Sequence, residues 1–105
     1  MIDAEKLKAF FDIVEEDKRQ FALDTVDEYV FFLDRIDELR KLPFIRVDKK
    51  NPERQMLTPA AKLIREYSQA VDAKRKTLLM ILYRVENSAA DELMNVLKQF
   101  EIETR

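Results

Sequence analysis

The chain has 105 residues and a formal net charge of −2, and it contains no glycine, cysteine or histidine. Without glycine, phosphate-binding glycine loops, dinucleotide fingerprints, EF-hand loops and nucleophile elbows are excluded, because all need glycine's backbone freedom. Without cysteine and histidine, disulfides, thiolate or imidazole metal sites and histidine-based triads are excluded as well. The composition predicts a small helical protein that binds rather than catalyses, so we expect neither enzyme activity nor a cofactor.

The size and hydropathy of the chain predict one domain in an aqueous compartment. A length of 105 residues is typical of a single domain, and a hydrophobic content of 47% is enough for a core. No window approaches 18 uncharged apolar residues, and the N-terminus does not begin with a basic stretch and an apolar run. The absence of cysteine fits a reducing compartment. We therefore predict a cytoplasmic protein with no membrane partner.

The first helical pattern begins after Asp3. Its carboxylate can accept hydrogen bonds from the amides of the first turn, and Leu7 and Phe11 lie on one helical face. This pattern predicts a helix over about 4–20. Residues 15–20 are fully polar, so the helix either fades there or continues as an exposed segment.

A second helix start is indicated at Thr25. Thr25 and Glu28 have the spacing of a capping box, in which each side chain binds a free amide of the first turn. The helix predicted over about 25–41 ends before Pro43, whose ring blocks a further turn. Its apolar stripe is too wide for contact with a single neighbour.

A linker and a long third helix follow. The linker is predicted over residues 43–57, with a first half that docks on a helix or forms a short extended piece and a second half that is solvated. Thr58 and Pro59 give the strongest helix start in the chain, a capping hydroxyl followed by proline at the first helical position. The helix predicted over about 59–85 would be about 40 Å long. We expect it to overhang the fold, because a compact chain of this size has a radius of gyration of only about 13 Å.

The last helix is predicted over about 89–100, with its cap at Asn87 or Ser88. The elements together predict an all-α protein with a single domain over 1–105, in which three to four helices form an elongated bundle. Self-association is expected, since the overhanging helix would otherwise expose apolar surface. The candidate residues of the core or of an oligomer seam are Tyr29, Phe32, Leu33, Ile36, Leu63, Tyr67, Val71, Leu78 and Leu82.

Charge is distributed unevenly along the chain. Residues 1–42 carry a net charge of −5, residues 43–85 carry +6 and residues 86–105 carry −3. Lysine and arginine side chains can neutralise the phosphates of a nucleic acid whatever its base sequence. The alternative is a solvated face whose charge is balanced by the acidic helices of the same fold. The candidate phosphate contacts are Lys49, Lys50, Arg54, Lys62, Arg65, Lys74, Arg75 and Lys76.

Two acidic clusters lie ten residues apart around the second predicted helix: Asp24, Asp27 and Glu28, and Asp34, Asp37 and Glu38. Paired carboxylates on a helix can hold magnesium, as in all-helical nucleotide pyrophosphohydrolases. However, acids at a helix start interact favourably with its macrodipole, and Arg35, Arg40 and Lys41 can pair with the second cluster. We therefore expect no metal site, with a magnesium-dependent hydrolase as the enzymatic alternative.

Two stretches resemble a known family. The first runs from Asp27–Asp34 through Glu38–Pro43, and the second from Asn51–Gln55 through Thr58–Tyr67 into the long helix. In order and spacing over roughly residues 26–82, they resemble the small terminase subunits of tailed phages and prophages of Gram-positive bacteria.

The resemblance implies a non-catalytic, oligomeric DNA-packaging factor in a bacterial host cell. Its partners would be further copies of itself, double-stranded DNA and a large terminase subunit that carries the ATPase and nuclease. Many small terminase subunits have an N-terminal helix-turn-helix, whereas residues 1–42 are acidic here, so DNA contact is expected from the basic middle of the chain. The alternative function is a helical homo-oligomeric interaction or regulatory module that does not bind nucleic acid.

Overall fold

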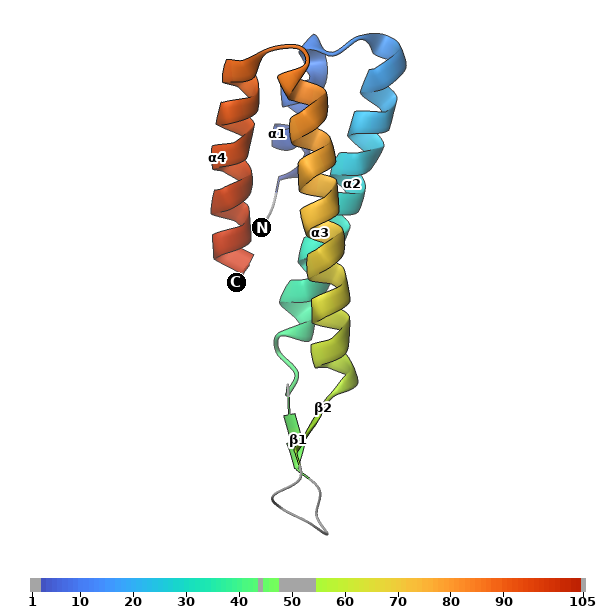
Figure 1. The fold of residues 1–105 in the computed structure, drawn as a ribbon, viewed down its shortest axis with the longest axis vertical. Helices are drawn as coiled ribbons and strands as arrows, with labels where there is room; N and C mark the ends of the chain where they lie inside the picture. Colours follow the sequence, from blue (N-terminus) through green and yellow to red (C-terminus); the bar gives the residue numbers. More distant parts are fainter. Residues whose placement is uncertain (1–2, 44, 48–54, 105) are drawn as a thin grey trace.

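The computed structural model describes residues 3–43, 45–47 and 55–104, and these form an all-α bundle with one small β-hairpin. The elements in chain order are α1 (Ala4–Ala9), the 3-10 turn η1 (Phe10–Ile13), α2 (Glu16–Leu39), β1 (Ile45–Val47), β2 (Gln55–Leu57), α3 (Pro59–Tyr83) and α4 (Asn87–Thr104). Figure 1 shows α2 and α3 running antiparallel along the molecule, with the hairpin at one end and α1 and α4 beside the other half.

The molecule is elongated, as the long helices predict. Its principal extents are 60 × 22 × 19 Å and its radius of gyration is 17.2 Å, against about 13 Å for a compact chain of this length. The predicted all-α class and elongated architecture are therefore confirmed. No helix in the described ranges carries an apolar run that could span a bilayer.

The boundary between the first two helices differs from the prediction of helices over 4–20 and 25–41. The chain breaks at Val14 and Glu15, which both have extended ψ angles of 144°, and α2 begins at Glu16. The polar residues 15–20 are thus the start of a helix and not its end, because acids in a first turn interact favourably with the helix macrodipole. Thr25 lies inside α2 and donates its hydroxyl hydrogen to the Phe21 carbonyl, 2.8 Å away, so the predicted capping box is absent.

The side chain of Arg19 stabilises the chain break between η1 and α2. Its guanidinium donates hydrogen bonds to the carbonyl oxygens of Asp12 (3.1 Å) and Val14 (2.8 Å). These oxygens lie where the 3-10 turn ends, so they have no partner further along the helix. The chain can therefore reverse, and α1 and η1 pack on α2 with Leu7 and Phe11 fully buried.

The start of α3 is confirmed. The Thr58 hydroxyl oxygen accepts a hydrogen bond from the Ala61 amide (3.3 Å), with Pro59 at the first helical position, and α3 ends at Tyr83, two residues before the predicted end. The same hydroxyl donates to the Pro43 carbonyl, 2.5 Å away, so Thr58 joins the two ends of the segment between α2 and α3.

The predicted linker over 43–57 contains an antiparallel hairpin. Ile45 pairs with Leu57 and Val47 with Gln55. β1 agrees with the short extended piece predicted for the first half, whereas the prediction of the second half as merely solvated chain missed β2. A three-residue strand has too little apolar alternation to be recognised alone, and it is specified by its pairing partner.

α4 is longer than the predicted 89–100. It begins at Asn87 and continues to Thr104. Ser88 lies within it and donates to the Glu86 carboxylate (2.7 Å), so it is not the predicted cap. The helix extends beyond Phe100 because Glu101, although charged, is a buried residue that contacts the bundle.

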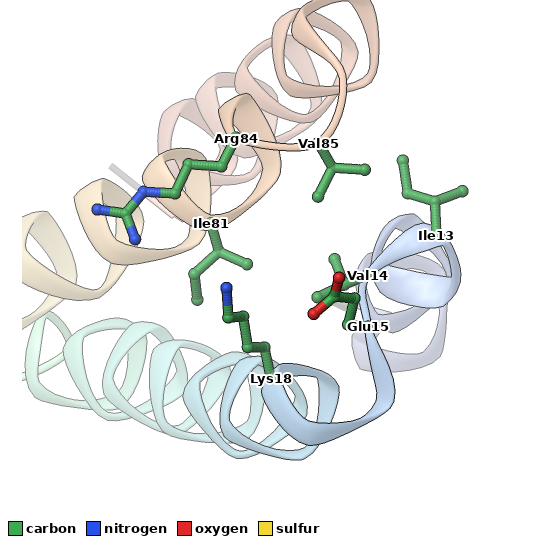
Figure 2. A pocket seen from close by; sticks show the side chains of 7 residues that line it. All are labelled: Ile13, Val14, Glu15, Lys18, Ile81, Arg84 and Val85. Atoms are coloured by element: carbon green, nitrogen blue, oxygen red, sulfur yellow. The ribbon is translucent and has the colours of Figure 1, made fainter.

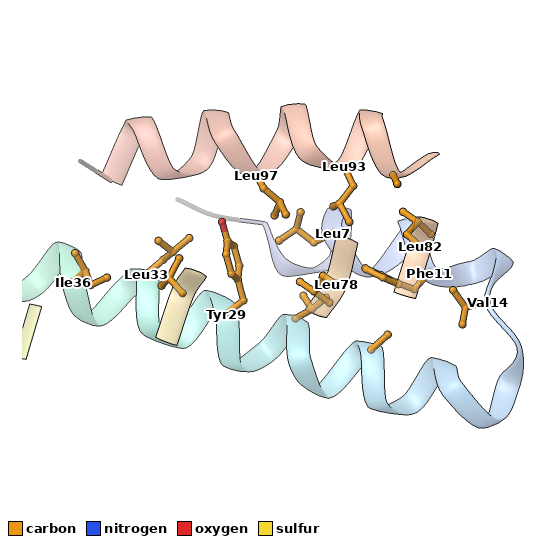
Figure 3. Packing of buried hydrophobic residues seen from close by; sticks show 14 residues of the cluster. Leu7, Phe11, Val14, Tyr29, Leu33, Ile36, Leu78, Leu82, Leu93 and Leu97 are labelled. Atoms are coloured by element: carbon orange, nitrogen blue, oxygen red, sulfur yellow. The ribbon is translucent and has the colours of Figure 1, made fainter. Parts of the chain in front are cut away.

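The core contains the predicted apolar seam within a single chain. Tyr29, Leu33, Ile36, Val71, Leu78 and Leu82 are buried in it, and Figure 3 shows the side chains of α1 and α4 meeting those of α2 and α3. Phe32 and Tyr67 are partly buried, with ring centroids 5.4 Å apart, and Leu63 is partly buried as well. Most of the apolar side chains that could have formed an oligomer contact therefore pack α2 against α3 within one chain. Self-association stays a prediction.

Candidate nucleic-acid interface

The predicted phosphate contacts fall into three groups. Lys49, Lys50 and Arg54 lie outside the described residues, in the sequence between β1 and β2. Lys62, Arg65 and Lys76 are exposed on α3, and none of them makes an ion pair within the described part of the chain. Lys74 and Arg75 are partly buried and bind acids of neighbouring helices.

Lys74 and Arg75 connect α3 to its neighbours. The Lys74 ammonium lies 2.5 Å from the Glu28 carboxylate of α2. The Arg75 guanidinium donates to the Asp72 carboxylate (2.8 Å) and to the Glu101 carboxylate of α4. For these two cations the charge is balanced by acids of the same fold, and reversing either charge would disturb the packing of the helices as well as any phosphate contact.

A buried polar network around Glu101 was missed by the sequence reasoning. Glu101 is 6% exposed and accepts a hydrogen bond from the Tyr29 hydroxyl (3.0 Å), while Tyr29 itself is fully buried. With Arg75 this network joins α2, α3 and α4. The signal in the sequence was its spacing, since Glu101 follows Leu93 and Leu97 at intervals of four and so lies on the same helical face.

The carboxylates of the two acidic clusters are dispersed rather than gathered. Asp27 lies 2.9 Å from the Lys8 ammonium, and the hydrogen bond between them raises the pKa of Lys8 above its usual value. Glu28 binds Lys74, Glu38 lies 2.7 Å from Arg35, and Asp24 accepts from the Gln20 amide (3.0 Å). In the described ranges no three acidic side chains converge on a possible metal position.

The described parts of the most basic segment of the chain lie at one end of the molecule. Residues 40–65, here called the basic end, contain eight basic and two acidic residues, a net charge of +6, while the other 79 residues carry −8. Because α2 and α3 are antiparallel, the last turn of α2 and the first turns of α3 lie together beside the hairpin, beyond α1 and α4 (Figure 1). Lys41, Lys62 and Arg65 are its exposed cations among the described residues.

Two hollows lie away from the basic end. One of about 360 Å³ between α3 and α4 is bounded by Leu79, Met94 and the Arg75–Glu101 pair. The other, of about 330 Å³, lies where η1 and the start of α2 meet the end of α3. Among the described residues, the charged side chains at the walls are Arg75, Lys98 and Glu101 in the first hollow and Glu15, Lys18 and Arg84 in the second.

Comparison of the chain with models of known families, with curated proteins and with solved structures gives no match. The class of protein is therefore described by its fold and charge alone. It is an elongated all-α bundle with a basic end, residues 40–65, and an acidic body, the remaining 79 residues. Any further assignment rests on the chemistry of these surfaces.

Proposed function

We propose that this protein is a non-catalytic double-stranded DNA-binding factor that contacts phosphates through its basic end. The observation that carries the proposal is the separation of charge, +6 in residues 40–65 and −8 in the remainder. Cations gathered on one surface release condensed counterions from DNA, which is the main source of sequence-independent affinity. The acidic body is repelled by the same phosphates, so the molecule approaches DNA end first.

The shape of the basic end supports this proposal. It consists of a two-stranded hairpin on the ends of two antiparallel helices, in a molecule only about 20 Å across. The major groove of B-DNA admits a two-stranded β-ribbon or a single helix. Lys62 and Arg65 are exposed in the first turns of α3, which follows β2 in the chain, and they suit contact with the phosphates at the groove edge.

The resemblance to small terminase subunits extends the proposal to a biological role. In that role the protein is oligomeric, binds the phage genome and delivers it to a large subunit with ATPase and nuclease activity. The basic end would contact DNA, and the acidic body would remain available to other copies and to the large subunit.

DNA binding is testable by fluorescence anisotropy with the full chain and a labelled duplex of about 30 base pairs of arbitrary sequence, an adequate length for phosphate contacts. We expect binding at low salt, with the logarithm of the association constant falling by about 0.9 per phosphate contact for each logarithmic unit of salt. Absence of binding at low salt would refute the proposal and leave the homo-oligomeric interaction module as the function.

Matched charge reversals locate the contact. The double variant Lys62→Glu/Arg65→Glu should lower affinity about tenfold or more and reduce the salt slope by about two contacts. The control Lys76→Glu/Lys98→Glu changes the net charge by the same amount at exposed positions away from the basic end. Equal losses in both variants would show that net charge, and not the basic end, governs binding. Lys74 and Arg75 are left unchanged because both stabilise the bundle.

A further inference from the structure

A surface with exposed apolar side chains and charges of both signs lies at the end of the molecule opposite the hairpin. It surrounds the hollow of about 330 Å³ between η1, the start of α2 and the end of α3. Its apolar part is formed by Ile13, Val14, Ile81 and Val85 (Figure 2). Ile13 is 48% exposed and Val85 47% exposed, so two large aliphatic side chains face water at the opening. Phe21, one turn of α2 beyond Lys18, is 60% exposed.

The charged residues around this hollow carry both signs. Glu15 and Lys18 extend into the opening, and Arg84 lies at its outer edge (Figure 2). None of the three makes an ion pair within the described ranges, whereas Lys8, Lys74 and Arg75 each pair with an acid of another helix. A partner that carried only one sign of charge would leave either the acid or the bases without a counterpart.

We infer that this surface, here called the dimer end, binds the dimer end of a second copy of the chain across a two-fold axis. A two-fold axis places residue i opposite residue j and, equally, j opposite i. Glu15 of each copy then meets Lys18 of the other, and Ile13 and Val85 of both copies cover one another. The contact thus pairs Glu15 with Lys18 twice and covers the apolar side chains, while Arg84 stays in solvent at the outer edge. This charge complementarity selects a second copy as the occupant.

This inference deepens the oligomeric part of the proposed function by assigning its contact surface. Because the dimer end and the basic end lie at opposite ends of a 60 Å molecule, the dimer leaves both basic ends free. One dimer would then present two DNA contacts, so its avidity for a long duplex would exceed that of a single chain.

The test is sedimentation velocity of the full chain without DNA over a range of protein concentrations. We expect a dimer that dissociates on dilution. Val85→Glu should raise the dimer dissociation constant about tenfold or more, because it buries an additional charge at the contact. The control Ile102→Glu, at a 74% exposed position beside the other hollow, should leave dissociation unchanged.

Charge exchange distinguishes a two-fold contact from any other use of this surface. Glu15→Lys and Lys18→Glu should each weaken the dimer, and the double variant Glu15→Lys/Lys18→Glu should restore it, because exchanged charges again meet across the axis. The inference would be overturned if the wild-type chain stayed monomeric, or if Ile102→Glu weakened the dimer and Val85→Glu did not. It would also be overturned if the double variant dimerised as weakly as either single variant. Circular dichroism melting of each variant separates dissociation from unfolding, and the anisotropy assay tests the basic end independently.

Discussion

At the scale of single residues, Glu101 shows how a polar side chain fixes the position of a helix. Its carboxylate lies in the core, where it accepts from the Tyr29 hydroxyl and pairs with Arg75. The apolar contacts of Leu93 and Leu97 alone would allow α4 to pack on the bundle in several registers. Only one of these registers places Glu101 against both Tyr29 and Arg75. A buried charge is tolerated here because its hydrogen-bonding capacity is used.

Replacing Glu101 should therefore destabilise the fold more than replacing an exposed acid of the same helix. We expect Glu101→Gln to lower the free energy of unfolding by about 1–3 kcal/mol, since charge-assisted hydrogen bonds are lost. The matched control Glu103→Gln changes an exposed carboxylate and should stay within about 0.5 kcal/mol. Urea unfolding followed by circular dichroism measures both, and equal values would show that the network does not stabilise the bundle.

At the scale of elements, a local capping pattern predicted the start of α3 correctly but not the start of α2. Thr58 and Pro59 marked the start of α3 correctly because the hydroxyl and the ring act locally, without help from the rest of the fold. Thr25 has an equally good local pattern, yet α2 continues through it. There the tertiary contacts of α1 and η1 with α2 decide, since a break at Val14 buries Leu7 and Phe11.

The two hydrogen bonds of the Thr58 hydroxyl should contribute measurably to the stability of the fold. Thr58→Ala removes the acceptor for the Ala61 amide and the donor to the Pro43 carbonyl, so we expect a loss of about 0.5–2 kcal/mol in the free energy of unfolding. Thr77→Ala is the matched control, because Thr77 lies inside the same helix and its hydroxyl only donates to the Ala73 carbonyl. Alanine is the better helix former there, so this variant should be neutral or stabilised. Thermal unfolding compares the two, and a larger loss at Thr77 would contradict the cap's role.

At the scale of the whole molecule, packing is unequal along the long axis. α1 and α4 cover α2 and α3 only in the half that contains Leu78 and Leu82, whereas the half toward the basic end consists of two helices and the hairpin (Figure 1). Fewer buried apolar contacts lower the free energy of local opening. The part proposed to meet DNA is thus the part with the least surrounding structure.

Hydrogen exchange should detect this difference in the free energy of local opening between the two halves of the molecule. We expect the amides of α3 over 71–83 to exchange at least about tenfold more slowly than those over 62–68, a difference of about 1.4 kcal/mol in opening free energy. Exchange followed by mass spectrometry on peptides of α2 gives an internal control, because residues 22–30 should be slow and residues 34–39 fast. Uniform protection along both helices would mean that the two-helix half is as stable as the four-helix half.

The sequence by itself determined the all-α class, the strong start of α3, the apolar stripes of the core and the uneven distribution of charge. Each of these depends on local periodicity, on capping or on composition, which a chain carries before it folds. Only the tertiary structure decided which charges remain free. Lys74 pairs with Glu28 and Arg75 with Glu101, each across two helices. Lys62 and Arg65, in contrast, are exposed and make no ion pair among the described residues. Such pairings join residues far apart in sequence, so they follow from the packing of helices and not from spacing along the chain.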